Sequence, residues 1–502
     1  MNKKRLFYNL VSGSLGQLLM VAAAILVPRL VMVNISSEAN GLLSSVNQML
    51  VYLGLMEAGV GTVTIQALFQ PVSEQNRDGI CSILAATKKY YLRTGTMYMI
   101  GVVLFSVLYP ILVDSELPLS TVILVILFSG SSGAVGFFFH SKFVLLLQAE
   151  GKNYILTSIS TLAQISISII KVVLLINGFD IVAVQGAYLL MMLAQSAAIC
   201  IYTHRNYPWL NLSVKPHEQA IPQKYSALLH QMCGLIFNNT DSLLLTVTWG
   251  LRYVSVYSVF TMVFSQLGNL VTIWTTSYLF VLGQALQQKF EQFQKEYRIF
   301  EMLSFLTTFV LGSVSAVMIT PFIRLYTDGV TDVDYLNPWY PPLFMVVFLL
   351  TNLRAPAQTA ITAAGHFKKT TPQAIAEAVI NLLVSLILLP KFGIIGVLIG
   401  TIVALGYRVN EMLFYSSKNI HKVKLSKTYG RILRNLVLFF LFSLLAKPVS
   451  AVCDSIVMFI VCGFVCTVAA LILFLGANAL VEREMFKEII SPLLKKFCKN
   501  QS

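Results

Sequence analysis

Basic residues of this 502-residue chain lie inside apolar stretches long enough to cross a membrane, among them Arg29, Lys171, Arg354 and Arg408. A charge at the centre of a bilayer costs about 2.5 to 3.5 kcal/mol on insertion scales, so such residues usually face a bundle interior or a watery cavity. The guanidinium of an arginine binds phosphate oxygens through two parallel hydrogen bonds. Buried basic residues therefore favour a site for an anionic group over a site for an organic cation, which needs buried carboxylates and aromatic rings.

The predicted helices that carry these residues have polar or small side chains on one face. Residues three or four positions apart share a face of a helix. Four such stripes are Thr157, Thr161, Gln164, Ser168 and Lys171; Thr351, Arg354, Gln358 and Thr362; Glu377, Asn381 and Ser385; and Gly396, Gly400, Ala404, Arg408 and Glu411. Polar faces on several helices predict a hydrated space between them. We expect the head group of a substrate to be bound there by Arg354, Arg408, Arg29, Lys171 and Gln358.

The two arginines of the second half of the chain have an alternative role. Arg354 and Arg408 could form internal ion pairs with Glu377 or Glu411, and such pairs would only lock helices together. Glu377 is also a candidate for a coupling or gating residue, because it lies on the polar stripe of its predicted helix.

The charged residues of the first half have alternatives as well. Arg29 and Lys171 could extend their apolar stems and reach the membrane interface. Asp241 aligns with Pro28 in an internal repeat, which places Asp241 at the height of Arg29 on the equivalent helix of the other half. We therefore expect Arg29 and Asp241 to form a gate. Glu57 lies in a glycine-rich run, where coupling and helix packing are both open.

Composition excludes a soluble fold. The chain is 56% hydrophobic and 12% charged, with a mean hydropathy of +0.75, whereas soluble domains are about 25% charged. The net charge of +14 does not indicate a nucleic-acid partner, since that would require a basic patch on a soluble surface. The seven cysteines are scattered, with no CxxC pair, so we expect neither disulfides nor a metal site. We expect no cofactor, while coupling to H⁺ or Na⁺ stays open.

Hydropathy predicts an all-α polytopic membrane protein with about fourteen spanning helices. The spans are 7–32, 41–68, 90–112, 119–147, 154–176, 181–203, 225–249, 254–283, 299–325, 340–363, 372–389, 393–415, 431–446 and 455–480. The basic start of the chain resembles a signal peptide, but no cleavage site follows, so the first span is predicted to be retained. Of 36 Lys and Arg residues, only Arg252, Arg324, Lys391 and Lys447 fall in the connections placed outside. This asymmetry predicts that both termini are cytoplasmic.

An internal repeat appears at an offset of about 213 to 214 residues. Ala149–Lys152 corresponds to Ala363–His366, and Asn177–Asp180 corresponds to Pro390–Gly393. Parallel repeats are an architecture of secondary transporters, whose substrate site lies between the repeats. The predicted organisation is a six-helix half 1–203, a cytoplasmic linker 204–224, a second half 225–415, a cytoplasmic loop 416–430, two additional helices in 431–480, and a cytoplasmic tail 481–502.

Five short motifs give the chain a family resemblance over nearly its whole length. They are Asn40–Leu42, Gly54–Gly61, Asn238–Leu244, Val256–Val259 and Ala364–Lys368. Their order and spacing, with twelve helices plus two, resemble the Wzx-type flippases of lipid-linked oligosaccharides. These belong to the superfamily of multidrug, oligosaccharidyl-lipid and polysaccharide exporters.

The resemblance implies a bacterial inner-membrane flippase and no enzyme. Its substrate would be an undecaprenyl-pyrophosphate-linked repeat unit of O-antigen, lipopolysaccharide or capsule, with a polysaccharide polymerase and a chain-length regulator as partners. The alternatives are a cation-coupled multidrug exporter of the same superfamily and a membrane polymerase or ligase. An enzyme would need a large outer loop or an acidic motif, and the outer connection 326–339 offers only Asp328, Asp332 and Asp334. Those residues fit a solvated loop or a cation site.

Overall fold

Only helices and closed barrels satisfy every backbone hydrogen bond inside a bilayer, and this chain uses helices. The computed structural model describes residues 22–57, 60–214 and 239–486, and every regular element within those ranges is a helix. Eleven of these helices are long and apolar enough to cross a membrane, and Ala22–Asn34 forms a shorter apolar helix. The predicted all-α polytopic fold is therefore confirmed.

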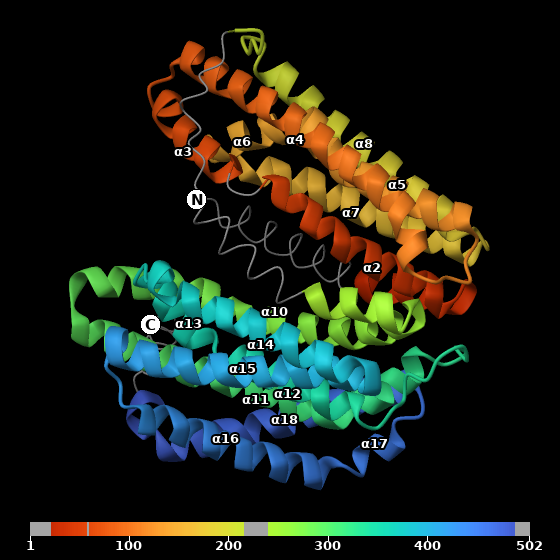
Figure 1. Ribbon diagram of the computed structural model, residues 1–502. Helices are drawn as coiled ribbons and strands as arrows, with labels where there is room; N and C mark the ends of the chain where they lie inside the picture. Colours follow the sequence, from red (N-terminus) through yellow and green to blue (C-terminus); the bar gives the residue numbers. More distant parts are fainter. Residues whose placement is uncertain (1–21, 58–59, 215–238, 487–502) are drawn as a thin grey trace, which may run out of the picture. The chain divides into compact units, whose positions relative to one another are not determined.

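Contacts divide the chain into two compact units, whose helices are labelled in Figure 1. Unit 1 is Met1–Val259 with Gly329–Val333, and unit 2 is Phe260–Asp328 with Asp334–Ser502. The division lies within one long helix, α10 (Leu251–Gln288). The division into halves by the sequence repeat stays a prediction.

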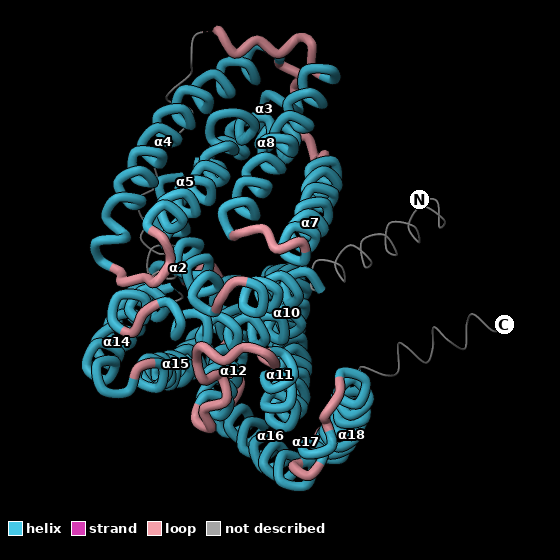
Figure 2. Tube along the Cα trace, turned by 90° about the vertical axis from the view of Figure 1, so that its right-hand side faces the viewer, coloured by secondary structure: helices cyan, strands magenta, loops and turns pink. Residues whose placement is uncertain are grey.

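Unit 1 is a set of helices with a shared apolar core. In addition to helical residues 239–248 it contains α2 (Ser37–Gly54), η1 (Leu55–Glu57), α3 (Val60–Ser73), α4 (Arg77–Leu112), α5 (Leu119–Val135), η2 (Gly136–His140), α6 (Ser141–Ala149), α7 (Asn153–Ile176) and α8 (Ile181–Asn206). Both views show α4, α5 and α8 packed along one another (Figures 1 and 2). Leu84, Tyr91 and Leu146 are among the fully buried side chains that hold this layer together.

Unit 2 is centred on the long helix α11 (Phe290–Tyr326). The other elements are α12 (Tyr340–Leu353), α13 (Ala355–Ala363), α14 (Phe367–Phe392), α15 (Ile394–Ser416), η4 (Ser417–His421), α16 (Leu425–Ala446), α17 (Val449–Val452) and α18 (Ile456–Val481). Helices α12, α16 and α18 all contact α11. Apolar side chains such as Val457 and Phe464 are more than 70% exposed on α18, which fits a helix surrounded by lipid.

The eleven membrane-length helices match eleven of the predicted spans, with two informative differences. Within predicted span 41–68 the α-helix α2 ends at Gly54 and the 3-10 turn η1 follows it, and α3 begins at Val60. Helices α4 and α11 begin at Arg77 and Phe290, well before the apolar runs at 90 and 299. Helical hydrogen bonds continue into water, whereas hydropathy marks only the part of a helix in lipid. The remaining predicted spans, 7–32 and 225–249, lie partly outside the described residues.

Candidate functional site

A helix break in unit 2 places Arg354 at the start of the candidate site. Pro356 has no N–H and cannot bond to the carbonyl of Asn352, so the helical ladder is interrupted between α12 and α13. Arg354 lies at this break, and its own N–H bonds back to the Asn352 carbonyl. The side chain of Arg354 therefore projects from the junction between α12 and α13.

Two glycines bring α15 unusually close to α14. A Cβ atom at Gly400 would lie 2.2 Å from Oγ of Ser385, and one at Gly396 would lie 2.7 Å from the backbone of Leu388. Only residues without a side chain permit this approach. The close packing also lets the amide of Asn381 donate to Oγ1 of Thr401 at 3.0 Å. The polar stripe of α14 and the small-residue stripe of α15 therefore face each other.

Four charged side chains meet beside this helix pair, and we call them the arginine–glutamate cluster: Arg354, Glu377, Arg408 and Glu411. Nη1 of Arg354 lies 2.5 Å from Oε1 of Glu377. Nε of Arg408 lies 3.2 Å from Oε2 of the same carboxylate, and Nη1 of Arg408 donates to Glu411 at 2.6 Å. Glu377 thus bridges two arginines that come from different helices.

Burial within the cluster is uneven. The side chains of Arg408 and Glu377 are 3% and 8% exposed, whereas those of Arg354 and Glu411 are each 15% exposed. Two positive and two negative charges cancel, so the cluster is formally neutral. Buried charges are tolerated when they are paired and hydrogen-bonded. The ion pairs that the sequence left as an alternative are present here, and the same arginines remain candidates for binding an anion.

The other residues predicted to bind a head group are divided between the two units. Gln358 is exposed on α13, one turn beyond Arg354. Lys171 of α7 belongs to unit 1, where its ammonium lies 4.6 Å from the ring centroid of Tyr188. A cation–π contact of this kind attracts an ammonium group to the face of an aromatic ring.

The predicted gate and coupling residues of unit 1 have other partners in this structure. Asp241 is 3% exposed and accepts a hydrogen bond from Tyr257 at 3.1 Å. Within the described residues, no ion pair joins it to Arg29, which is half-buried. Glu57, at the interruption between α2 and α3, accepts a hydrogen bond from Tyr91 at 2.9 Å. Gating by Arg29 with Asp241 and coupling through Glu57 stay predictions.

A second buried charge network in unit 2 was not predicted. Nη1 of Arg431 lies 2.5 Å from Glu301, which is fully buried on α11, and Nη2 of Arg431 lies 2.5 Å from Glu482. Arg434 also pairs with Glu482, at 2.9 Å. The network joins α16 and the end of α18 to α11. The sequence signal for this network was Glu301, a carboxylate inside the apolar run 299–325, since a charged group within a membrane span needs a partner.

One residue of the connection 326–339, predicted to lie outside, is hydrogen-bonded to another part of unit 1. Asp332 accepts hydrogen bonds from the backbone N–H of Ser37 at 2.9 Å and from its hydroxyl at 2.6 Å. It therefore lies at the amino terminus of α2, where a negative charge is favourable. Among the described residues no group of His, Cys, Asp or Glu side chains could hold a metal ion.

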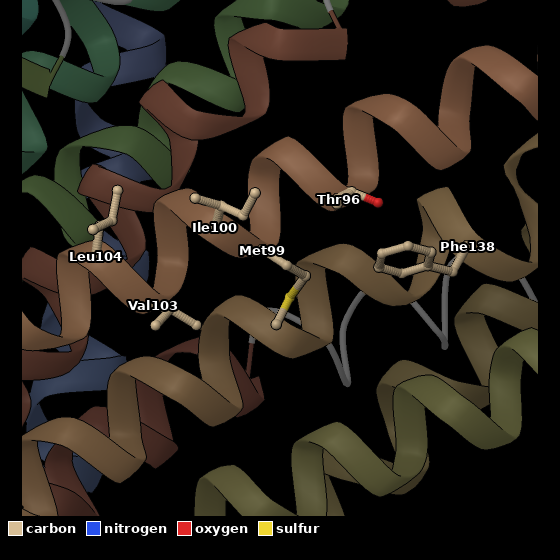
Figure 3. Close-up of a pocket in the computed structure, with 6 residues that line it drawn as sticks. All are labelled: Thr96, Met99, Ile100, Val103, Leu104 and Phe138. Atoms are coloured by element: carbon tan, nitrogen blue, oxygen red, sulfur yellow. The ribbon is translucent and has the colours of Figure 1, made fainter.

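A pocket on α4 has a different character. It has a volume of about 350 Å³, and Figure 3 shows Thr96, Met99, Ile100, Val103 and Leu104 of α4 opposite Phe138. The hydroxyl of Thr96, its one polar side chain, donates to the carbonyl of Leu92. Ile100, Val103 and Leu104 are about half exposed. This apolar lining suits a hydrocarbon chain and offers nothing to a charged head group.

Comparison with solved structures identifies the architecture. The lipid II flippase MurJ, in an inward closed conformation, matches with a TM-score of 0.71 at 12% identity, over 95% of this chain and 100% of that one. The chain has the fold of the MOP-superfamily transporters. An inward-facing multidrug resistance MATE family transporter of that superfamily matches at 0.59, with 16% identity, over 79% of this chain and 96% of that one. The MATE multidrug transporter DinF-BH matches at 0.56, with 12% identity, over 82% of this chain and 94% of that one.

The similarity between this chain and these transporters is one of fold alone. No protein-family model and no curated protein matches the sequence. The structures that share the fold are transporters, and with eleven membrane-length helices the chain is a multi-pass membrane protein. The fold is that of these membrane transporters and flippases, and the arginine–glutamate cluster lies on helices of this fold.

Proposed function

We propose that the protein is a flippase that moves an undecaprenyl-pyrophosphate-linked oligosaccharide from the cytoplasmic to the outer leaflet by alternating access. The observation that carries the proposal is that two arginines, Arg354 and Arg408, share one carboxylate inside the membrane part of a MOP fold. Two guanidinium groups held together in this way can each take one phosphate of a diphosphate. The product would supply the synthesis of O-antigen, lipopolysaccharide or capsule, with a polymerase and a chain-length regulator as partners.

The extent of the structural match supports a lipid flippase. MurJ aligns over 95% of this chain, and the unmatched 5% is shorter than the segment from α16 to α18, so the match must include part of the two additional helices. The MATE transporter matches 79%. A plan of twelve helices plus two thus agrees better with the flippase. A negative head group that moves outward also gains about 2.3 kcal/mol per charge for each 100 mV of membrane potential.

The second candidate is a cation-coupled multidrug exporter. Two carboxylates of the cluster, the buried Glu377 and the partly exposed Glu411, favour it, because they could attract an organic cation if the arginines moved away. In this structure both carboxylates are bound by guanidinium groups at 2.5 to 3.2 Å, and a cation would have to enter against those fixed positive charges.

Deletion of the gene tests the function in cells. We expect loss of surface polysaccharide and build-up of lipid-linked repeat units on the cytoplasmic side, because the substrate would still be made. Normal surface polysaccharide with increased sensitivity to toxic organic cations would instead identify a drug exporter. Repeating the export measurement after collapse of the H⁺ or the Na⁺ gradient would identify the coupling ion.

The proposal also places the protein in the bacterial inner membrane with both termini in the cytoplasm. Reporter fusions should locate loops 69–89 and 416–430 inside and loop 326–339 outside, because lysine and arginine concentrate on the inner side. Cysteine labelling of intact cells provides the matched readout. A terminus on the outer side would contradict the fourteen-helix map.

A further inference from the structure

Glu377 occupies the position that a bridging anion would take. Its two carboxylate oxygens contact different arginines, Oε1 with Arg354 at 2.5 Å and Oε2 with Arg408 at 3.2 Å. The charged groups that face it are Arg354 from the junction of α12 and α13, and Arg408 and Glu411 from α15. Nearer the start of α14, His366 is bonded to Tyr415 at 3.1 Å. A ligand that uses both arginines must therefore displace this carboxylate.

We propose that Glu377 is a built-in competitor that makes the site selective for a doubly charged anion, and this inference rests on the proposed function. A monoanion that displaced Glu377 would bring one negative charge where one was already bound. It would also leave the carboxylate buried and repelled. A diphosphate brings at least two charges and offers a separate phosphate to each arginine. Specificity of this kind comes from a repulsive element as well as from attraction.

The unequal exposure of the two arginines sets the order in which an anion would contact them when it replaces Glu377. Arg354 is more exposed than Arg408, at 15% against 3%, so an anion meets Arg354 first. Arg408 keeps a second carboxylate, Glu411, at 2.6 Å, and is held in place when Glu377 leaves. If Glu377 competes with the anion, neutralising it should raise the affinity for the anion. If Glu377 only forms a structural ion pair, neutralising it should lower that affinity or leave it unchanged.

Anion binding by the purified full-length chain tests the competitor role. The protein is placed in nanodiscs of neutral lipid, and calorimetry measures affinity for inorganic pyrophosphate and for dimethyl phosphate, a monoanion, at constant ionic strength. The wild type should bind pyrophosphate and discriminate against dimethyl phosphate. Glu377→Gln should bind both probes more tightly, with the larger gain for dimethyl phosphate. The gain should be about 2- to 150-fold, the range for charged groups in contact.

Glu482→Gln is the matched control, because Glu482 also bridges two arginines in unit 2, Arg431 and Arg434. It should leave both affinities unchanged. If Glu377→Gln does not fold, Glu377→Asp keeps the charge but is too short to bridge, and it should still reduce the discrimination. Equal affinities in wild type and Glu377→Gln would overturn the competitor role and leave the proposed function standing. Failure of every variant to bind either probe would overturn both.

Discussion

Replacing Arg408 with glutamine should abolish export of lipid-linked repeat units while the protein still inserts into the membrane. Arg408 binds both Glu377 and Glu411 from a nearly fully buried position. Its loss changes the formal charge of the cluster from zero to minus one, and the site then repels a pyrophosphate. The measurement is surface glycan at matched protein levels. Arg324→Gln is the control, since Arg324 is 47% exposed in a pair with Asp454.

Two further variants separate binding from stability. Arg408→Gln combined with Glu377→Gln restores neutrality, so it should be more stable than Arg408→Gln alone, while export stays lost because one phosphate ligand is missing. Arg408→Lys should restore export in part, since an ammonium provides the charge without the two-pronged geometry of a guanidinium. Near-normal surface glycan in the single glutamine variant would show that Arg408 only joins helices.

The local part of the candidate site could be predicted from the sequence. Spacing of three or four residues placed Gly400 and Arg408 on one face of a helix, and Glu377 and Asn381 on one face of another. In the structure these two faces pack together, because Gly396 and Gly400 of α15 have no side chain that would keep α14 away. The connection between α14 and α15 is a single turn at Gly393, so the helices that carry the pair are antiparallel neighbours, and local periodicity was sufficient.

Contacts between distant parts of the chain could not be read in this way. Glu301 and Arg431 are 130 residues apart, and Arg431 is the first residue of its predicted span, directly after the basic loop 416–430. Asp332 is hydrogen-bonded to Ser37, 295 residues away in the sequence, although an acidic loop in the sequence gives no sign of a partner. A single sequence records which residues need partners inside a membrane, whereas the partner itself depends on which helices pack together.

The two charge networks of unit 2 suggest different uses of similar chemistry. In the arginine–glutamate cluster two carboxylates serve two arginines, and both Arg354 and Glu411 are partly exposed. In the second network Glu301 is fully buried and receives three hydrogen bonds, from Arg431 at 2.5 Å, Thr428 at 2.9 Å and Tyr297 at 3.3 Å. A carboxylate satisfied on all sides cannot exchange for a ligand without a large penalty. We therefore infer that the second network fixes α16 and α18 to α11.

Arg431→Gln should accordingly destabilise the protein far more than it alters substrate preference. The variant leaves the carboxylate of Glu301 buried without its guanidinium, and breaking a buried ion pair from one side costs about 3 to 5 kcal/mol. Glu301→Gln should cost less, because Arg431 keeps Glu482 as a partner at 2.5 Å. Thermal unfolding of the detergent-solubilised chain measures the difference. Arg434→Gln is the matched control, since this side chain is 19% exposed and outside the contact with Glu301.

The double variant Arg431→Gln with Glu301→Gln completes the cycle. It removes both charges of the pair, so it should be more stable than Arg431→Gln alone, by an interaction term of about 0.5 to 3 kcal/mol. Pyrophosphate affinity should remain that of the wild type in every variant that folds, because the arginine–glutamate cluster is formed by other residues. Additive losses of stability would show that Glu301 and Arg431 do not interact, and α16 would then be held to α11 by apolar packing alone.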